Sequence, residues 1–107
     1  TEHFKTLINL LKRVKNIVKE EKDNNTLLDE SLFEKEEERE LYNFSNELER
    51  LENKEFSIYI NTLLERSNVI NEYFDNVIIN TENSKIKNNR VALLKKIENS
   101  IEKIMII

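Results

Sequence analysis

Apolar residues recur along most of the chain at intervals of three and four, the period of an amphipathic helix. Four such stripes predict helices over about residues 2–22, 34–53, 54–74 and 84–105. Their members are Phe4, Leu7, Leu11, Val14 and Val18; Leu41, Phe44, Leu48 and Leu51; Phe56, Ile60, Leu63, Ser67, Ile70 and Phe74; and Ile86, Leu93 or Leu94, Ile97, Ile101 and Ile104. In the third stripe Ser67 has a small side chain, which favours a close approach between helices.

The segments between the stripes predict how the helices are joined. The link near residue 53 is so short that the second and third helices must form an antiparallel hairpin. In residues 27–33 we expect three apolar side chains to hold a connector against the core, as a helical turn; they are Leu28, Leu32 and Phe33.

The last connector, residues 75–83, breaks the helical period. Val77, Ile78 and Ile79 are consecutive and β-branched, which favours extended backbone. We expect these apolar side chains to pack against the bundle. Asn83 or Ser84 then caps the last helix, because both residue types accept hydrogen bonds from free N–H groups of a first turn.

Composition narrows the fold class and the possible chemistry. The 107 residues include no Gly, no Pro, no Cys and one His, His3. Tight hairpins, phosphate-binding loops and nucleophile elbows need Gly, and thiolate or zinc chemistry needs Cys or His. We therefore predict one all-α domain over residues 1–107, an antiparallel bundle of about four main helices, with no catalytic residue and no metal site.

Charge is divided along the sequence. Residues 1–22 carry a net +3, residues 23–53 carry −8, residues 54–84 carry −3 and residues 85–107 carry +4, within a total of −4. If the two basic ends lie side by side, they form a positive surface able to meet phosphates. The alternative is that they neutralise the acidic middle.

The acidic run Glu34-Lys35-Glu36-Glu37-Glu38 has two interpretations. It could bind a metal or a basic partner. The favoured interpretation is that it opens the second helix on a solvated face, where carboxylates compensate the helix dipole.

Two stretches carry a family resemblance. One is Lys12-Arg13-Val14-Lys15-Asn16-Ile17; the other runs from Phe74-Asp75-Asn76-Val77-Ile78-Ile79 to the segment from Lys85 to Leu94. In this order they resemble the C-terminal anticodon-binding domain of bacterial glycyl-tRNA synthetase β subunits, a helical bundle of the DALR class. The likeness covers nearly the whole chain, although Lys87 stands where the family has Arg and Val91 where it has Leu.

The resemblance implies that the chain is the anticodon-binding part of a longer enzyme. The parent would be an α2β2 ligase that charges tRNA(Gly) with glycine, using ATP and magnesium, and this chain would catalyse nothing alone. Its partners would be the tRNA(Gly) anticodon stem-loop, the rest of the β subunit and the α subunit. We expect a cytoplasmic protein without a membrane partner, because no apolar run approaches the ~20 residues of a transmembrane helix.

The resemblance also implies a set of RNA-binding residues in the basic segments. These are Lys12, Arg13, Lys15, Asn16, Lys19, Lys85, Lys87, Asn88 and Arg90. Two residues are expected to be structural: Asp75, as an ion-pair partner that would lock the connector to Arg90, and Asn89, as a cap or buttress of the same corner. For Arg90 the RNA contact and the ion pair with Asp75 stay open as alternatives.

Two other functions remain possible from the sequence. One is the DALR domain of an arginyl-type synthetase, although that enzyme's C-terminal pattern is missing. The other is a helical protein-interaction module without RNA binding, in which the acidic second helix docks a basic partner.

Overall fold

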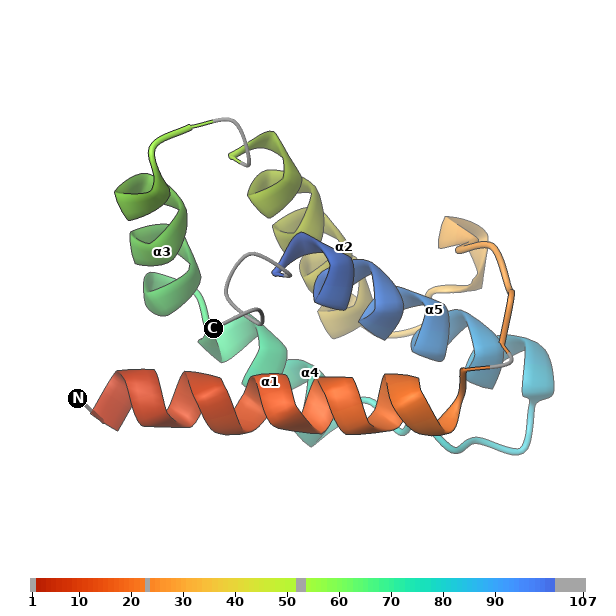
Figure 1. The fold of residues 1–107 in the computed structure, drawn as a ribbon. Coiled ribbons are helices and arrows are strands. Elements are labelled where there is room, and N and C mark those ends of the chain that lie inside the picture. Colours follow the sequence, from red (N-terminus) through yellow and green to blue (C-terminus); the bar gives the residue numbers. More distant parts are fainter. Residues whose placement is uncertain (1, 23, 52–53, 102–107) are drawn as a thin grey trace.

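The computed structural model describes residues 2–22, 24–51 and 54–101 (Figure 1). Within them the elements are all helical: α1 (Glu2–Glu20), η1 (Glu30–Leu32, a 3-10 turn), α2 (Glu36–Arg50), α3 (Phe56–Glu65), α4 (Asn68–Asn76) and α5 (Ser84–Ser100). The predicted all-α bundle is confirmed. The expected ends of the second helix near residue 53 and of the last helix near residue 105 lie outside the described residues.

The third predicted helix is two helices, α3 and α4. The N–H of Arg66 still donates to the Thr62 carbonyl, 3.0 Å away, but the backbone of Arg66 leaves the helical conformation, and α4 begins after Ser67. The Ser67 hydroxyl donates to the Leu64 carbonyl at 3.3 Å, a local bond that competes with the helical ladder. Ser67 therefore lies at a break between helices and not in the middle of one, and its expected role in a close helix approach stays a prediction.

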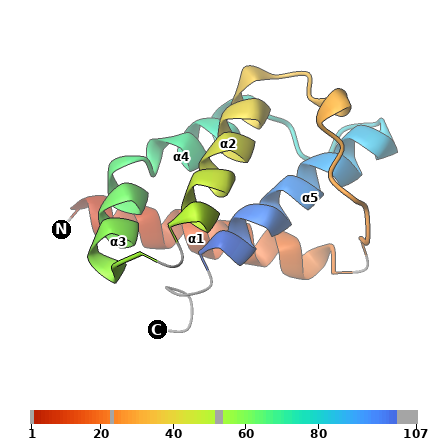
Figure 2. The ribbon, with the colours of Figure 1, turned by 90° about the horizontal axis from the view of Figure 1, so that it is seen from above.

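The helices form layers in which α5 lies between α1 and α2. α2 packs against α5 and α4, whereas α1 packs against α5 and, near its own start, against α3. Figures 1 and 2 show α1 and α5 running in opposite directions. The predicted hairpin has its turn between α2 and α3, but α2 packs along α5 and α4 more than along α3.

The buried core follows most of the predicted stripes. Its largest fully buried side chains come from all five α-helices; they are Tyr59, Tyr73, Phe44, Leu7, Leu41, Leu48, Leu63, Ile70, Leu93, Leu94 and Ile97, with Ile101 just past the end of α5. Phe4 and Phe56 are exceptions, at 45% and 51% exposed. Both stand in the first turn of a helix. Periodicity shows which face of a helix is apolar, but not how far the neighbouring helices cover the ends of that face.

The connector after α4 starts extended at Val77, as predicted, and bends from Ile79 onward; the side chains at its start alternate. Val77 is buried, Ile78 is 70% exposed and Ile79 is half-buried. Alternation is the rule for extended backbone, so the expectation that all three pack inward is wrong for Ile78. Asn83 is confirmed as the cap of α5, since its Oδ1 accepts hydrogen bonds from the N–H groups of Lys85 and Ile86.

The first connector behaves as predicted except at Leu32, which is not among the residues packed against the core. Leu28 and Phe33 pack against the core, Leu32 is half-buried, and η1 is the expected helical turn. Over the described part of the chain, every helix is too short or too polar to span a bilayer.

Candidate nucleic-acid interface

The outer face of α1 carries a row of cations. Lys12, Lys15 and Lys19 follow the spacing i, i+3, i+7, which places them on one side of the helix. They are exposed because Leu11 and Val14 take the inward positions. We call these three residues the lysine stripe. Asn16 is exposed beside it.

Arg13 lies on a different flank of α1, toward α4. Its guanidinium carbon is 4.2 Å from the centre of the Phe74 ring. Arg13 is exposed and Phe74 is 8% exposed. A cation over an aromatic face at an exposed site contributes about 0.5–1 kcal/mol. The contact holds the planar guanidinium in place while leaving it at the surface.

The first turn of α5 meets the end of α1. The Lys87 ammonium lies 3.2 Å from a Glu21 carboxylate oxygen, and both side chains are about one-third exposed. Lys85, two residues earlier, is exposed. This contact confirms that the two basic ends of the sequence lie side by side.

Acidic charge gathers on another layer. α2 carries six acidic and two basic residues, whereas α1 carries five Lys or Arg and two Glu. Figure 1 shows α1 along one side of the bundle and α2 beyond α5. The charge partition in the sequence is therefore a partition between two sides of the fold.

Asn88 and Asn89 have different surroundings. Asn88 is half-buried, and its backbone carbonyl accepts a hydrogen bond from the Asn24 side chain at 3.0 Å. Asn89 is 1% exposed, and its amide binds both the N–H and the carbonyl of Asp29, at 2.7 and 3.0 Å. Asn89 is a buttress, as expected, but it holds the first connector rather than the one after α4.

Arg90 points into the bundle. It is 4% exposed; its Nη1 donates to the Ile78 carbonyl at 2.7 Å, and its Nη2 lies 3.2 Å from carboxylate oxygens of both Glu34 and Glu38. These contacts remove Arg90 from the candidate RNA face. The expected pairing with Asp75 is also wrong: Asp75 is exposed at the end of α4 and accepts a hydrogen bond from Asn71.

Glu38 differs from the rest of the acidic run. Its side chain is fully buried, and its Oε1 also accepts hydrogen bonds from the backbone N–H groups of Glu34 and Lys35. The expectation that the whole run is a solvated face is wrong at this position. Glu38 is the third residue of α2, where a Glu reaches back to cap the helix start.

Tyr73 completes this buried polar group. Its hydroxyl donates to the Arg90 carbonyl at 3.0 Å. Burial raises the pKa of Tyr73, the Glu38 charge raises that pKa further, and the Arg90 charge opposes them. We call Glu38, Tyr73 and Arg90 the buried cluster.

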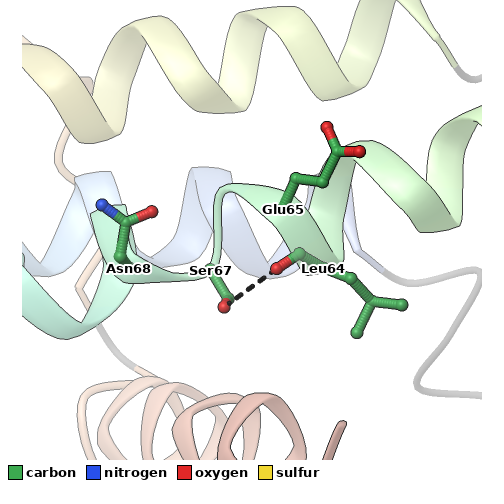
Figure 3. A pocket seen from close by; sticks show the side chains of 4 residues that line it. All are labelled: Leu64, Glu65, Ser67 and Asn68. Atoms are coloured by element: carbon green, nitrogen blue, oxygen red, sulfur yellow. Dashed lines mark hydrogen bonds between the residues drawn. The ribbon is translucent and has the colours of Figure 1, made fainter. Parts of the chain in front are cut away.

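One hollow lies away from all the predicted site residues. It has a volume of about 550 Å³ at the α3–α4 break and is lined by Leu64, Glu65, Ser67 and Asn68. Figure 3 shows the Ser67 hydroxyl bonded to the Leu64 carbonyl at this place. It holds no cation, so it is a poor site for a phosphate.

Two further hollows flank the Lys87–Glu21 ion pair. One, of about 270 Å³, is lined by Ile17, Glu20, Glu21, Ile79, Asn80 and Lys87. The other, of about 550 Å³, is lined by Glu21, Asn24, Asn25, Thr26 and Asn88. The sequence predicted Lys87 and Asn88 as site residues, but not the connector residues that line these hollows with them. Within residues 2–22, 24–51 and 54–101, no three His, Cys, Asp or Glu side chains are grouped to hold a metal ion.

Known proteins with similar sequences include subunits of enzymes that act on tRNA. The chain is 40% identical over 96 residues to a glycine–tRNA ligase β subunit of Aquifex aeolicus, covering 90% of this chain and 14% of that protein. It is 38% identical to the β subunit of Lactobacillus acidophilus and 31% identical to that of Persephonella marina, covering 87% and 94% of this chain.

The chain spans 13–15% of the length of these relatives. The family described as the DALR anticodon binding domain matches residues 7–107, which is almost the whole sequence. The helical bundle, with its basic ends brought together, thus belongs to the DALR anticodon-binding domain family.

Proposed function

We propose that this chain binds the anticodon region of a tRNA through the lysine stripe and the first turn of α5. The observation that carries the proposal is the contact between Lys87 and Glu21, because it joins the two basic segments into one surface. Membership of an anticodon-binding family supports the same assignment.

The two parts of this surface suit different parts of an RNA loop. The ammonium groups of the lysine stripe and of Lys85 are exposed, so they can neutralise phosphates without first breaking an internal contact. Asn16, Asn88 and the Arg13 guanidinium offer donors and a planar face to unstacked bases. Arg90 takes no part in this surface, because its side chain is buried.

The parent protein we infer is a glycine–tRNA ligase β subunit. In it, the chain would hold tRNA(Gly) while the rest of the β subunit and an α subunit, in an α2β2 enzyme, perform the aminoacylation in the cytoplasm. ATP and magnesium would serve that reaction elsewhere in the enzyme. The curated relatives carry this name and are several times longer than this chain.

The test is a titration at low salt with two anticodon stem-loops, one with a glycine anticodon and one that differs only in the anticodon bases. We expect tighter binding of the glycine loop. Affinity should fall log-linearly with salt, with a slope of about −0.7 for each single-strand phosphate neutralised.

Two outcomes would contradict the proposal in different ways. Absence of binding to either loop would favour a protein-interaction module. Preference for an arginine anticodon loop, added as a third probe, would favour the arginyl-type assignment. A Glu65→Ala variant, altered in the hollow at the α3–α4 break, is a control that should bind like the unchanged protein.

A further inference from the structure

The smaller hollow beside the Lys87–Glu21 ion pair has a mixed lining. Ile17 of α1 and Ile79 of the connector are half-buried and pack against the core. Glu20, Asn80 and Lys87 supply its polar groups. At about 270 Å³ it lies just below the roughly 300–1,000 Å³ of sites for drug-sized ligands, so its natural occupant is a smaller group.

The charges of this lining exclude a phosphate as that occupant. Two of its residues, Glu20 and Glu21, are carboxylates, and its one cation, Lys87, is already paired with Glu21. A phosphate would meet like charge here, whereas the lysine stripe nearby offers exposed cations. A neutral group that donates hydrogen bonds fits the carboxylates better.

Glu20 is the residue of this lining whose carboxylate is best placed to bind a ligand. It lies in the last turn of α1, where a carboxylate faces the negative end of the helix dipole. It is exposed, and among the described residues its carboxylate makes no hydrogen bond or ion pair. It borders the hollow whose lining also includes Ile17 and Ile79.

We propose that this hollow receives one unstacked nucleobase that carries an exocyclic amino group. The base would place its faces against Ile17 and Ile79, as flipped bases do between apolar side chains. Its amino group would donate to Glu20, the pairing that carboxylates make with the amino group of cytosine. The Asn80 amide can donate to or accept from a second position on the base edge.

The neighbourhood of the hollow suits a bound RNA loop. Arg13 lies one turn before Ile17 on α1, with its guanidinium held over Phe74. A guanidinium plane at the surface is a stacking partner for an adjacent unstacked base. Phosphates on either side of the bound base would be within the field of the lysine stripe.

This inference rests on the proposed RNA binding, and a Glu20→Ala variant separates the two. If Glu20 merely lies near RNA, removal of its negative charge beside a basic surface should strengthen binding. If Glu20 accepts a hydrogen bond from a base, its removal should weaken binding of the glycine-anticodon stem-loop by about 5- to 150-fold, the range for one good base contact. The sign of the change is therefore decisive.

A scan of stem-loops that each lack one loop base locates the contact. With the unchanged protein, one abasic position should lower affinity strongly; with Glu20→Ala, the same position should no longer matter. Glu65→Ala is the matched control, because it removes an exposed Glu that borders the remote hollow at the α3–α4 break. We expect this control to reproduce the pattern of the unchanged protein.

The opposing results are equally clear. If Glu20→Ala binds as tightly as or more tightly than the unchanged protein while Lys12→Ala binds more weakly, the base site is wrong and the RNA-binding surface stands. If the unchanged protein binds no stem-loop, both proposals fall. A uniform penalty at every abasic position in both proteins would also overturn the base site.

Discussion

Lys87 and Arg90 lie one helical turn apart on α5, and they show how differently two regions of this fold use a cation. Lys87 is about one-third exposed and pairs with Glu21 at the surface where α5 meets α1. Arg90 is 4% exposed and belongs to the buried cluster, with Glu38 fully enclosed beside it. A positive charge thus forms a surface ion pair in one region and a buried ion pair in the other.

The two ion pairs differ in whether water can solvate one charge after its partner is removed. An exposed ion pair contributes about 0–1 kcal/mol, because solvent screens it and rehydrates either partner. A buried pair gives little net stability, but removal of one partner costs about 3–5 kcal/mol, because the other charge is left without water. Cations of the surface region are therefore free to exchange partners at little cost, as the proposed RNA binding requires, whereas Arg90 is committed to the fold.

The Arg90→Ala variant should have the largest effect on stability. It leaves Glu38 charged and buried without its partner and removes a donor from the Ile78 carbonyl. We expect the free energy of unfolding to fall by about 3–5 kcal/mol. Urea denaturation followed by circular dichroism measures this loss.

Lys87→Ala is the matched control, since it removes a cation from the surface pair of the same helix. It should lose no more than about 1 kcal/mol. Equal losses in the two variants would erase the distinction between the regions. A stable Arg90→Ala protein that no longer binds RNA would return Arg90 to the RNA face.

Asn89 tests the buried side of α5 at a smaller scale. Asn89→Ala removes two hydrogen bonds to the Asp29 backbone, and we expect a loss of about 1–3 kcal/mol with faster hydrogen exchange at the Asp29 amide. Asn88→Ala is the adjacent control, because the Asn88 contact with Asn24 uses its backbone carbonyl. If exchange at Asp29 stayed slow in Asn89→Ala, the first connector would be held by something else.

Tyr73 predicts a pH dependence of the buried cluster. Its pKa is raised in the folded protein above the ordinary value of 10.0. Above pH 10 the unfolded chain releases the Tyr73 proton while the folded protein retains it. The stability that depends on the protonated hydroxyl is therefore complete below pH 10 and is lost as pH rises beyond it.

Denaturation series at pH 8 and pH 11 should show this loss in the unchanged protein and a smaller loss in Tyr73→Phe. At pH 8 the variant lacks only the hydrogen bond to the Arg90 carbonyl, at a cost of about 0.5–1.5 kcal/mol. Parallel declines with pH in the two proteins would mean that other groups cause the alkaline loss.

The two regions were not equally predictable from sequence. The lysine stripe follows directly from the spacing of Leu11 and Val14, because exposure is the complement of an apolar stripe. The meeting of the basic ends could be stated only as a condition, since charge alone does not place one helix beside another. The family resemblance supplied the order of the motifs, and the structure supplied their contact.

The buried cluster was missed although its signal was present. Arg90 falls on the apolar stripe of its helix, four residues after Ile86 and three before Leu93. Glu38 likewise lies three residues before Leu41, on the stripe of α2. A basic and an acidic residue at inward positions of two helices indicate a buried pair, whereas charge counts along the sequence treat both as surface groups.

The break between α3 and α4 had no comparable signal. The apolar period passes through it without a shift, with Leu63, Ile70 and Phe74 all buried in one core. Ser67 alone marks the place, and serine is common within helices as well as at their ends. The break is visible only in the structure, in the backbone of Arg66 and in the Ser67–Leu64 hydrogen bond.

Lys12→Ala should have the smallest effect on stability and is the sharpest probe of the surface region. Lys12 is exposed on α1, so we expect the melting temperature to stay unchanged. Binding of the glycine-anticodon stem-loop should weaken, and the salt dependence of log affinity should become shallower by about 0.7, the loss of one phosphate contact.

Lys54→Ala is its control, because it removes an exposed lysine from the link between α2 and α3, away from the lysine stripe. It should leave the salt dependence as it is. A lower melting temperature of Lys12→Ala with unchanged affinity would mean that Lys12 supports the fold and not the RNA. Weaker binding with an unaltered salt slope would mean that Lys12 meets a base edge and not a phosphate, so the lysine stripe would have to be divided residue by residue between the two kinds of contact.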